Sequence, residues 1–173
     1  MSATTTQRPN VIPEVVIGTQ TWASQNYDFA GDPPNGDYDN ITAYGKLYTW
    51  DEAVAIAAGI DGWHLPSGTE WNTLMGYLGG STVAGGYLKE AGTTHWDSPN
   101  IGADNSSGFT AVAAGGRRHD TEAYEHFGVY ALFWSSTGGA TEAGWWVLWT
   151  NEASLAQGSI DQDYKCSVRL IKD

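Results

Sequence analysis

The second half of the chain, from Gly108 onward, consists of short alternating or aromatic runs that glycines and polar clusters interrupt. Runs of this kind are typical of antiparallel strands joined by loops. We expect strands near residues 109–113, 131–135, 145–150, 155–159 and 167–171. Because the helix signals all lie before Gly108, the sequence predicts an α+β fold rather than alternating α/β units.

Two segments of the first half carry the signals that start a helix. Thr49 and Glu52 form a capping-box pattern ahead of an alanine-rich run. Ser67 and Glu70 repeat the box, and the apolar residues that follow fall at i, i+3, i+4 and i+7 on one face: Trp71, Leu74, Met75 and Leu78. The sequence therefore predicts helices that begin close to Thr49 and Ser67, and residues 83–90 add a weaker helical turn.

The N-terminal segment divides into a tail and the start of a domain. Residues 1–13 hold small polar residues and two prolines without periodicity, which is typical of a flexible tail. Residues 15–17 and 21–23 cluster β-branched and aromatic side chains on either side of Gly18, so we expect two short strands there. Since 173 residues fit one domain, residues 14–173 are assigned to a single domain.

The charge and the cysteine content exclude several classes of protein. Twenty acidic residues against eight lysines and arginines give a formal charge of −12, which repels a phosphate backbone and excludes nucleic acid as a partner. The one cysteine, Cys166, excludes an intramolecular disulfide, and we interpret it as a core thiol. No stretch approaches the roughly 20 apolar residues of a membrane span, so we expect no membrane insertion. Residues 1–10 lack the apolar run of a signal peptide.

No catalytic or metal motif is complete in this sequence. The four histidines lack zinc-ligand spacing, and there is no nucleophile elbow, P-loop or dinucleotide fingerprint. Asn35, Asp37 and Asp39 have the i, i+2, i+4 spacing of a calcium loop, but the later positions that need Gly and Glu hold other residues. We expect no catalytic residue, no cofactor and no transition metal. A structural calcium ion at Asp32, Asp37 and Asp39 is the one exception left open.

Several motifs follow one another in the order of a known family. They are IGTQTW at 17–22, YGKLYTW at 44–50, GWHLPSGTEW at 62–71, NSSGF at 105–109, GGR at 115–117, FWSST at 133–137 and SVRL at 167–170. With this set the chain resembles the Fibrobacter succinogenes major paralogous domain over most of its length. Residues 164–166 depart from the pattern, because many relatives have a Gly-aromatic pair before Ser-Val-Arg.

The resemblance implies both a fold and a ligand face. The family is similar to the formylglycine-generating-enzyme-like branch of the C-type lectin fold, which also supplies the variable proteins of diversity-generating retroelements. The implied C-type lectin-like fold has two helices packed on small antiparallel sheets, with the ligand face in the C-terminal third. In the retroelement proteins the segment between the FWSST and SVR motifs is hypervariable, and here it covers residues 138–166.

The candidate recognition residues lie within this segment. Rigid amphipathic aromatics among adaptable polar groups are typical of a recognition surface. We select as contact residues Trp145, Trp149, Asn151, Glu152, Asp161, Asp163 and Tyr164, with the loop 124–126 as an edge. The alternative is that members such as Trp146 and Leu148 face the core. Trp63 and Trp71 are expected to bury against the strand at 133–134 as scaffold residues.

These expectations favour a non-enzymatic ligand-binding protein: a receptor-binding protein or adhesin of a virion or of an extracellular bacterial surface. Its partner would be a protein or glycan receptor on a cell surface, and homo-oligomer formation is left open. The alternative is a carbohydrate-binding module that uses exposed tryptophans. An oxidase of the formylglycine-generating type is excluded, because the resemblance ties that activity to paired cysteines and this chain has one.

Overall fold

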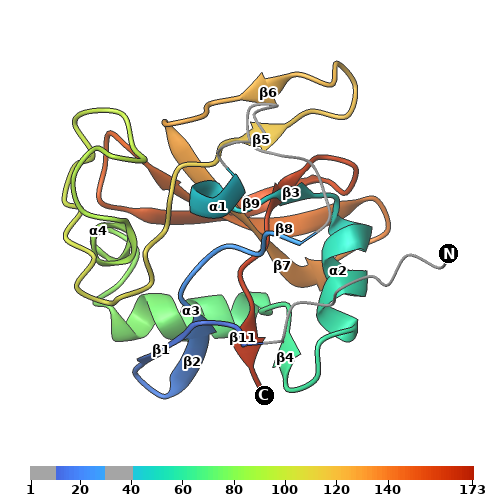
Figure 1. Ribbon diagram of the computed structural model, residues 1–173, viewed down its shortest axis with the longest axis horizontal. Coiled ribbons are helices and arrows are strands. Elements are labelled where there is room, and N and C mark those ends of the chain that lie inside the picture. Colours follow the sequence, from blue (N-terminus) through green and yellow to red (C-terminus); the bar gives the residue numbers. More distant parts are fainter. Residues whose placement is uncertain (1–10, 30–40) are drawn as a thin grey trace, which may run out of the picture.

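The polypeptide combines few helices with several small sheets in a mixed α/β architecture (Figure 1). The computed structural model describes residues 11–29 and 41–173. Its helices are α1 (Ile41–Tyr44), α2 (Trp50–Ala58), α3 (Gly68–Tyr77) and α4 (Ala84–Leu88). None of the helices in the described ranges is long and apolar enough to cross a membrane.

Three sheets contain the described strands. A four-stranded sheet has the order β1 (Glu14–Ile17), β2 (Gln20–Ala23), β11 (Ile171–Lys172) and β4 (Trp63–His64). A five-stranded sheet has the order β3 (Leu47–Tyr48), β10 (Cys166–Ser167), β7 (Tyr130–Gly138), β8 (Glu142–Trp149) and β9 (Leu155–Asp161). The third is the hairpin of β5 (Gly116–Arg117) and β6 (Tyr124–Glu125). All these pairings are antiparallel except that of β10 with β7, which is parallel.

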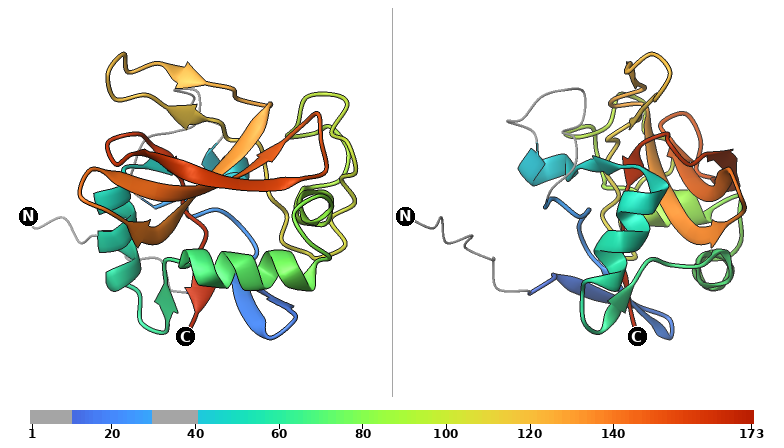
Figure 2. Two further views of the ribbon diagram at one scale, coloured as in Figure 1. Left: turned by 180° about the vertical axis from the view of Figure 1, so that it is seen from behind. Right: turned by 90° about the vertical axis from the view of Figure 1, so that its right-hand side faces the viewer.

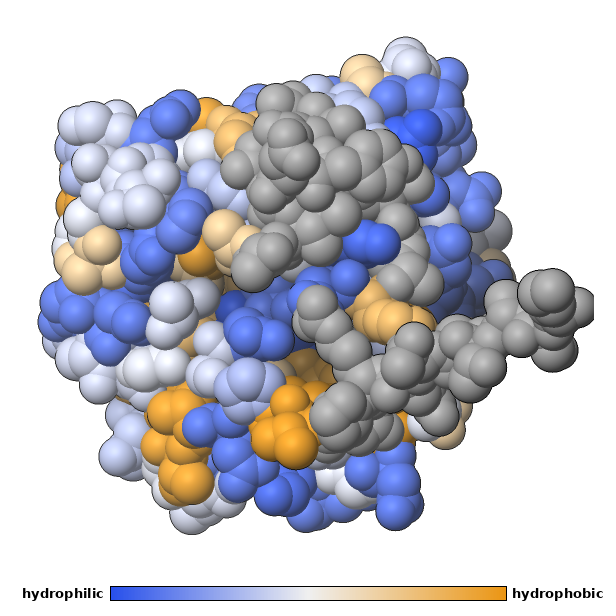
Figure 3. Space-filling view, in the orientation of Figure 1, coloured by the Kyte–Doolittle hydropathy of each residue, from blue (hydrophilic) through white to orange (hydrophobic). Residues whose placement is uncertain are grey.

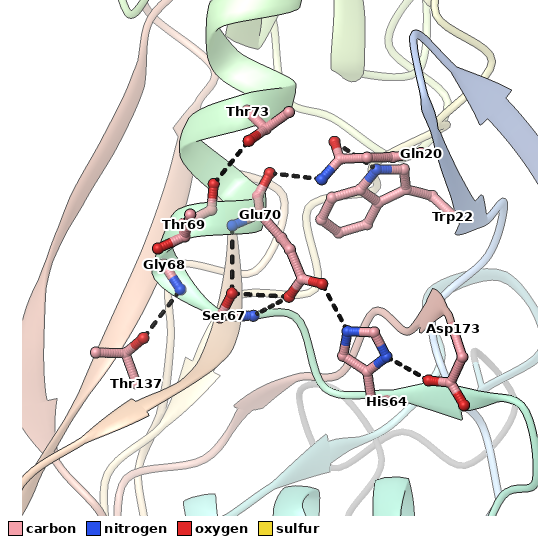
Figure 4. Close-up of polar contacts among 10 residues, drawn as sticks. All are labelled: Gln20, Trp22, His64, Ser67, Gly68, Thr69, Glu70, Thr73, Thr137 and Asp173. Atoms are coloured by element: carbon pink, nitrogen blue, oxygen red, sulfur yellow. Dashed lines mark hydrogen bonds and ion pairs between the residues drawn. The ribbon is translucent and has the colours of Figure 1, made fainter.

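The helices α2 and α3 begin where the capping boxes predicted. The Thr49 side chain accepts a hydrogen bond from the Glu52 N–H, and the Glu52 carboxylate accepts one from the Thr49 N–H at 2.8 Å. Ser67 and Glu70 repeat this exchange at α3, with 2.7 Å between the Ser67 nitrogen and Glu70 Oε2 (Figure 4). Such reciprocal bonds satisfy N–H groups that the start of a helix leaves without partners. The weaker turn predicted at 83–90 is α4.

The main core lies between α3 and the strands β7 and β8. Trp71 is fully buried: its ring stacks on that of Trp146 with centres 5.6 Å apart, and it lies tilted to that of Phe133 with centres 5.7 Å apart. The predicted burial of Trp71 is thus confirmed. The predicted burial of Trp63 is only partial, because β4 is an outermost strand of its sheet and the Lys172 ammonium lies 5.7 Å from the Trp63 ring centre.

Most of the strand predictions are confirmed, but residues 109–113 form no strand. Ala111 makes only an isolated bridge with Lys89, and Thr110 has a positive φ of 55°, which a regular strand does not contain. The apolar alternation of this segment reflects burial, because the Ala111 N–H donates to the carbonyl of Leu88 at the end of α4 rather than to a neighbouring strand. The predictions at β1, β2, β7, β8 and β9 match strands of the structure.

The predicted strand at 167–171 is divided between β10 and β11, which belong to different sheets. The chain crosses from one sheet to the other at Arg169, whose side chain is fully buried. The guanidinium donates to the Ala23 carbonyl at 3.0 Å, to Asn26 Oδ1 at 2.6 Å and to two further carbonyls, those of Phe109 and Thr110. Burial lowers the pKa of Arg169 to about 9, so the group stays charged at neutral pH.

Cys166, at the start of β10, is fully buried, and burial raises the pKa of its thiol. The prediction of a core thiol is confirmed. A buried thiol that keeps its proton is a poor nucleophile and a poor metal ligand.

His64 connects segments that lie far apart in the sequence (Figure 4). Its Nε2 lies 2.7 Å from Glu70 Oε1, at the start of α3, and its Nδ1 lies 2.7 Å from Asp173 Oδ1. Burial lowers the pKa of His64, but the two carboxylates outweigh burial and the pKa is raised. Burial raises the pKa of Glu70, but hydrogen bonds from Ser67 and His64 outweigh it and the pKa is lowered.

We expect the His64 cluster to stabilise the fold most at mildly acidic pH. The raised His64 pKa contributes stability that is fully present below the unfolded value of 6.5 and is lost as pH rises through the folded value. The lowered Glu70 pKa contributes stability present above the unfolded value of 4.5 and lost as pH falls through the folded value. His64→Gln should therefore lower the melting temperature more at about pH 5.5 than at about pH 8.5.

Thermal denaturation of the variant at both pH values tests this expectation. His119→Gln is the matched control, because the His119 side chain is exposed. A loss from His64→Gln that is equal at the two pH values would contradict the predicted protonation of His64.

Candidate recognition site

The strand β8 presents different side chains to the two faces of its sheet. Trp146 and Leu148 are buried in the core against α3, which confirms the alternative prediction for these two residues. Trp145, Val147 and Trp149 alternate with them and point to the opposite face, as the two-residue period of a strand requires. The hairpin β5–β6 lies on this opposite side, away from α3 (Figure 2, left).

A groove of about 410 Å³ opens between this face of the sheet and the hairpin. Backbone pairing sets its floor, because Tyr130 lies opposite Trp149, and Leu132 lies opposite Val147. The sheet side of the lining comprises Tyr130, Leu132, Trp145, Val147, Trp149, Ile160, Asp161 and Tyr164. The hairpin side comprises Arg118, His119, Asp120, Glu125 and His126.

The Trp149 ring meets two neighbouring rings of the groove at steep angles. Tyr130 and Trp149 have ring centres 5.1 Å apart at an interplanar angle of 76°, and His126 meets Trp149 at 74°. The Trp145 ring lies over Gly158 of β9, where a Cβ atom would come within 2.5 Å of the indole. Glycine at this position leaves the space that the indole occupies. Because Trp145 and Trp149 are both partly exposed, the groove offers aromatic surface to a ligand.

The polar groups of the groove gather around the Tyr164 hydroxyl and the Arg118 guanidinium. The Tyr164 hydroxyl lies 2.8 Å from that of Tyr130 and donates to Glu125 Oε2 at 3.1 Å. Burial raises the pKa of both tyrosines, that of Tyr130 to about 12, so both phenols are protonated at neutral pH. Arg118 donates to Asp120 at 2.8 and 2.7 Å, and these hydrogen bonds lower the pKa of Asp120.

The groove brings together four of the seven predicted contact residues: Trp145, Trp149, Asp161 and Tyr164. Tyr164 is buried, with 6% of its surface exposed, so its expected position on an open face is wrong. Its hydroxyl instead takes part in the hydrogen bonds with Tyr130 and Glu125. The other three are exposed but do not line the groove: Asn151, Glu152 and Asp163. The predicted edge at 124–126 supplies two lining residues, Glu125 and His126.

A buried lysine explains why Asn151 and Glu152 lie outside the groove. The Lys89 ammonium donates to the carbonyls of Ile101, Trp149 and Glu152, each at 2.9 Å. The turn after β8, which carries Asn151 and Glu152, is therefore anchored to Lys89. Burial lowers the pKa of Lys89 to about 8, although the negative charge of Glu152 acts to raise it.

Three groove residues at the hairpin tip were not predicted from the sequence: Arg118, His119 and Asp120. Their only local signal is a run of charged and imidazole side chains directly after the GGR motif. The hairpin reaches the groove through a long-range contact, since the backbones of Arg117 and Lys165 exchange two hydrogen bonds at 3.1 and 2.9 Å. No local pattern encodes that pairing.

Within residues 11–29 and 41–173, no group of three or more His, Cys, Asp or Glu is placed to hold a metal ion. The calcium candidates Asp32, Asp37 and Asp39 lie outside the described residues.

A second hollow, around Val16 and Tyr77, has no charged lining residue. Apolar groups appear near β1 at the lower left of Figure 3.

The fold is that of a small mixed α/β protein with an aromatic and charged groove on one sheet face. The chain belongs to the Fibrobacter succinogenes major domain family, whose model matches residues 15–172. This confirms the family that the motifs indicated. Comparison with curated proteins and with solved structures gives no match.

Proposed function

We propose that the protein is a non-enzymatic ligand-binding module that recognises a receptor in the groove between the hairpin β5–β6 and the outer face of β7–β8–β9. The observation that carries this proposal is one groove lined by Trp145 and Trp149 of the sheet and by Arg118 and Glu125 from a separate part of the chain. Tryptophan, tyrosine and arginine are the residues in which binding energy concentrates. The receptor is a protein or glycan on a cell surface.

We further propose a C-type lectin-like fold and a retroelement-diversified phage or bacterial surface protein with its variable segment at 138–166. Two helices beside small sheets support the fold, and the groove floor supports the segment. Ser167 pairs with Phe133, so both ends of the segment are held in one sheet, and solvent-facing changes between them alter stability little. A near-copy of these codons beside a reverse transcriptase gene is expected at the locus. Its absence would refute the retroelement origin.

A carbohydrate-binding module is the second candidate, and the part-exposed indoles of Trp145 and Trp149 favour it. An indole offers an apolar face for the C–H side of a sugar ring. Asp161 lines the same groove, and a carboxylate can accept hydrogen bonds from sugar hydroxyls.

Binding screens with groove variants test the proposed function. The purified chain is presented to a displayed peptide library and to a glycan array, and each ligand is then measured against Trp149→Ala. We expect this variant to bind at least about 30-fold more weakly, which corresponds to roughly 2 kcal/mol for a central aromatic contact.

The control is Tyr77→Ala, at an exposed aromatic residue in the second hollow, which should leave binding unchanged. Trp149→Phe keeps an aromatic ring at this position and serves as the second variant if Trp149→Ala does not fold. If the selected ligands bind Trp149→Ala as tightly as the unmodified chain, the groove is not the recognition site. If this holds for the ligands from the peptide library and for those from the glycan array, both candidate functions are refuted.

A further inference from the structure

The strand β9 is a free border of the five-stranded sheet, because it pairs with β8 and with no other described strand. The pairing is regular over all seven of its residues, and five of the seven are exposed. Lysine, proline and bulges protect free strand edges in many proteins. None of them occurs in β9, so this side of the sheet ends in an open strand edge.

Hydrogen bonds at the two ends of β9 show which of its backbone groups point outward. The Leu155 N–H donates at 2.8 Å to the carbonyl of Ser81, which lies outside the sheet. The Gln162 N–H, just after the strand, donates at 3.1 Å to the carbonyl of Thr141 in continuation of the β8 register. Successive residues of a strand direct their backbone groups to opposite sides. The odd-numbered residues of β9 therefore direct theirs away from β8.

Most of these outward groups have no hydrogen-bond partner in the described part of the chain. They are the N–H and C=O groups of Gln157 and Ser159 and the N–H group of Asp161. Unpaired backbone groups in this alternating order are what an additional strand pairs with, as in strand addition by extended peptides. The chemistry of this edge thus fits a peptide backbone.

The charge at one end of β9 indicates which side chain such a strand would carry. Glu142 and Asp161 lie directly opposite each other in the β8–β9 register, where two like charges are unfavourable. Glu142 accepts a hydrogen bond from the Ser159 hydroxyl at 2.6 Å, and Asp161 accepts one from the Asp163 N–H at 2.9 Å. Neither carboxylate is in an ion pair with a lysine or arginine of the described residues.

A cation on the next strand, beside Asp161, would offset this repulsion. The net charge of the chain, −12, has the same sign and attracts a basic partner from a distance. A second copy of the chain would bring a further −12 to the same edge, so the charge favours a different protein as the occupant.

A further hollow gives room for side chains of an added strand. It has a volume of about 310 Å³ and borders β9 at Gln157 and Ser159, with Gly144 and Thr137 among its other lining residues. Gly144 lies opposite Ser159 in the register, so small residues from two strands leave this space open.

We propose that an extended, basic segment of a protein partner pairs antiparallel with the outer edge of β9, with a lysine or arginine beside Asp161 and Glu142. This surface is separate from the groove around Trp149, and the inference does not rest on the proposed function.

The probe is the peptide acetyl-Lys-Thr-Val-Thr-Val-Thr-Lys-amide, which reads the same in both directions. Paired with β9, it places a lysine beside Asp161 and its two valines opposite Ser159 and Gln157. Amide hydrogen exchange measured by NMR follows the binding. At saturating peptide we expect exchange at Gln157 and Ser159 to slow at least about tenfold, because their N–H groups gain partners, while Ala156 and Gly158, which already pair with β8, change little.

Modified peptides separate backbone pairing from other modes of binding. N-methylation of the two valines removes N–H groups that face β9 and should weaken binding at least about tenfold. N-methylation of two threonines, whose N–H groups face away, is the matched control. Glutamine in place of both lysines should weaken binding several-fold, and Asp161→Asn should abolish the difference between the lysine and glutamine peptides.

Ser159→Pro tests the same edge from the side of the protein. It removes an outward N–H that the pairing with β8 does not use, a position where an edge strand tolerates proline. We expect it to abolish peptide binding, whereas Ser159→Ala, which keeps the backbone N–H, should bind as the unmodified chain does. If Ser159→Pro does not fold, the two N-methylated peptides decide.

Equal binding of the two N-methylated peptides, unchanged binding to a folded Ser159→Pro, or no effect at several millimolar peptide would each overturn strand addition at β9. Protection of Gln157 and Ser159 that rises with the concentration of the chain alone would show that the occupant is a second copy and would overturn the assignment to a partner. Trp149→Ala should bind the peptide unchanged, so this outcome and that of the groove experiments are independent.

Discussion

Trp71→Ala is expected to lower the free energy of unfolding by about 3–5 kcal/mol, the range found for deletion of a large buried aromatic side chain. The Trp71 side chain is fully buried at the centre of an aromatic cluster, with ring centres 4.8 to 5.9 Å from those of Trp22, Phe109, Phe133 and Trp146. Its removal leaves a cavity between α3 and the sheet, because the strands on both sides are fixed by their backbone pairing. Urea denaturation followed by circular dichroism measures the loss.

Trp71→Phe is the matched control. This variant keeps an aromatic ring in the core and removes the indole N–H, which has no hydrogen-bond partner among the described residues. We therefore expect a clearly smaller loss than for alanine, and a smaller loss again for Trp63→Ala at a part-exposed position. An unfolding curve for Trp71→Ala that matches the unmodified chain would show that the helix presents a different face to the core.

Arg169→Leu is expected to cost at least about 3 kcal/mol, because each buried acceptor left without a partner costs roughly 1–3 kcal/mol. The buried guanidinium donates to three backbone carbonyls and to Asn26 Oδ1. It also lies 4.1 Å from the ring centre of Phe109. Leucine retains apolar contact with that ring, so the measured loss reports mainly on the hydrogen bonds.

The same denaturation experiment on Arg118→Leu supplies the comparison. Arg118 is exposed at the hairpin tip and its ion pair with Asp120 is open to solvent, so its replacement should leave the midpoint almost unchanged. Losses of similar size for the two arginines would contradict the structural role assigned to Arg169. A small loss for Arg169→Leu would show that the acceptors find other partners.

The sequence predicted those parts of the fold that depend on neighbouring residues. Thr49 and Ser67 each start a helix through contacts within three positions, and Trp146 and Leu148 follow the two-residue period of a strand. The prediction at 109–113 was wrong because an alternating pattern reports which side chains are buried, whereas the backbone partners of Ala111 and Ala113 lie on α4, in the loop after it and at Gly128. Long-range hydrogen bonding of that kind leaves no local pattern.

In the candidate site, too, local sequence predicted some residues, and others depend on long-range contacts. Trp145 and Trp149 could be selected because they lie on one face of a recognisable strand. Arg118 could not be selected, because its place in the groove depends on the contact between Arg117 and Lys165, which are 48 positions apart. Tyr164 was recognised as part of the site, but its burial results from packing beneath the hairpin, where Gly116 leaves room for its ring.

The hairpin β5–β6 belongs to neither of the two larger sheets. Residues between β5 and β6 form one wall of the groove, yet none of them takes part in the ladder of β7, β8 and β9. An insertion or deletion at 119–122 would therefore alter the depth and reach of the groove without shifting the strand register beneath it. The length of this loop can thus change the shape of the groove independently of amino-acid exchange on the sheet.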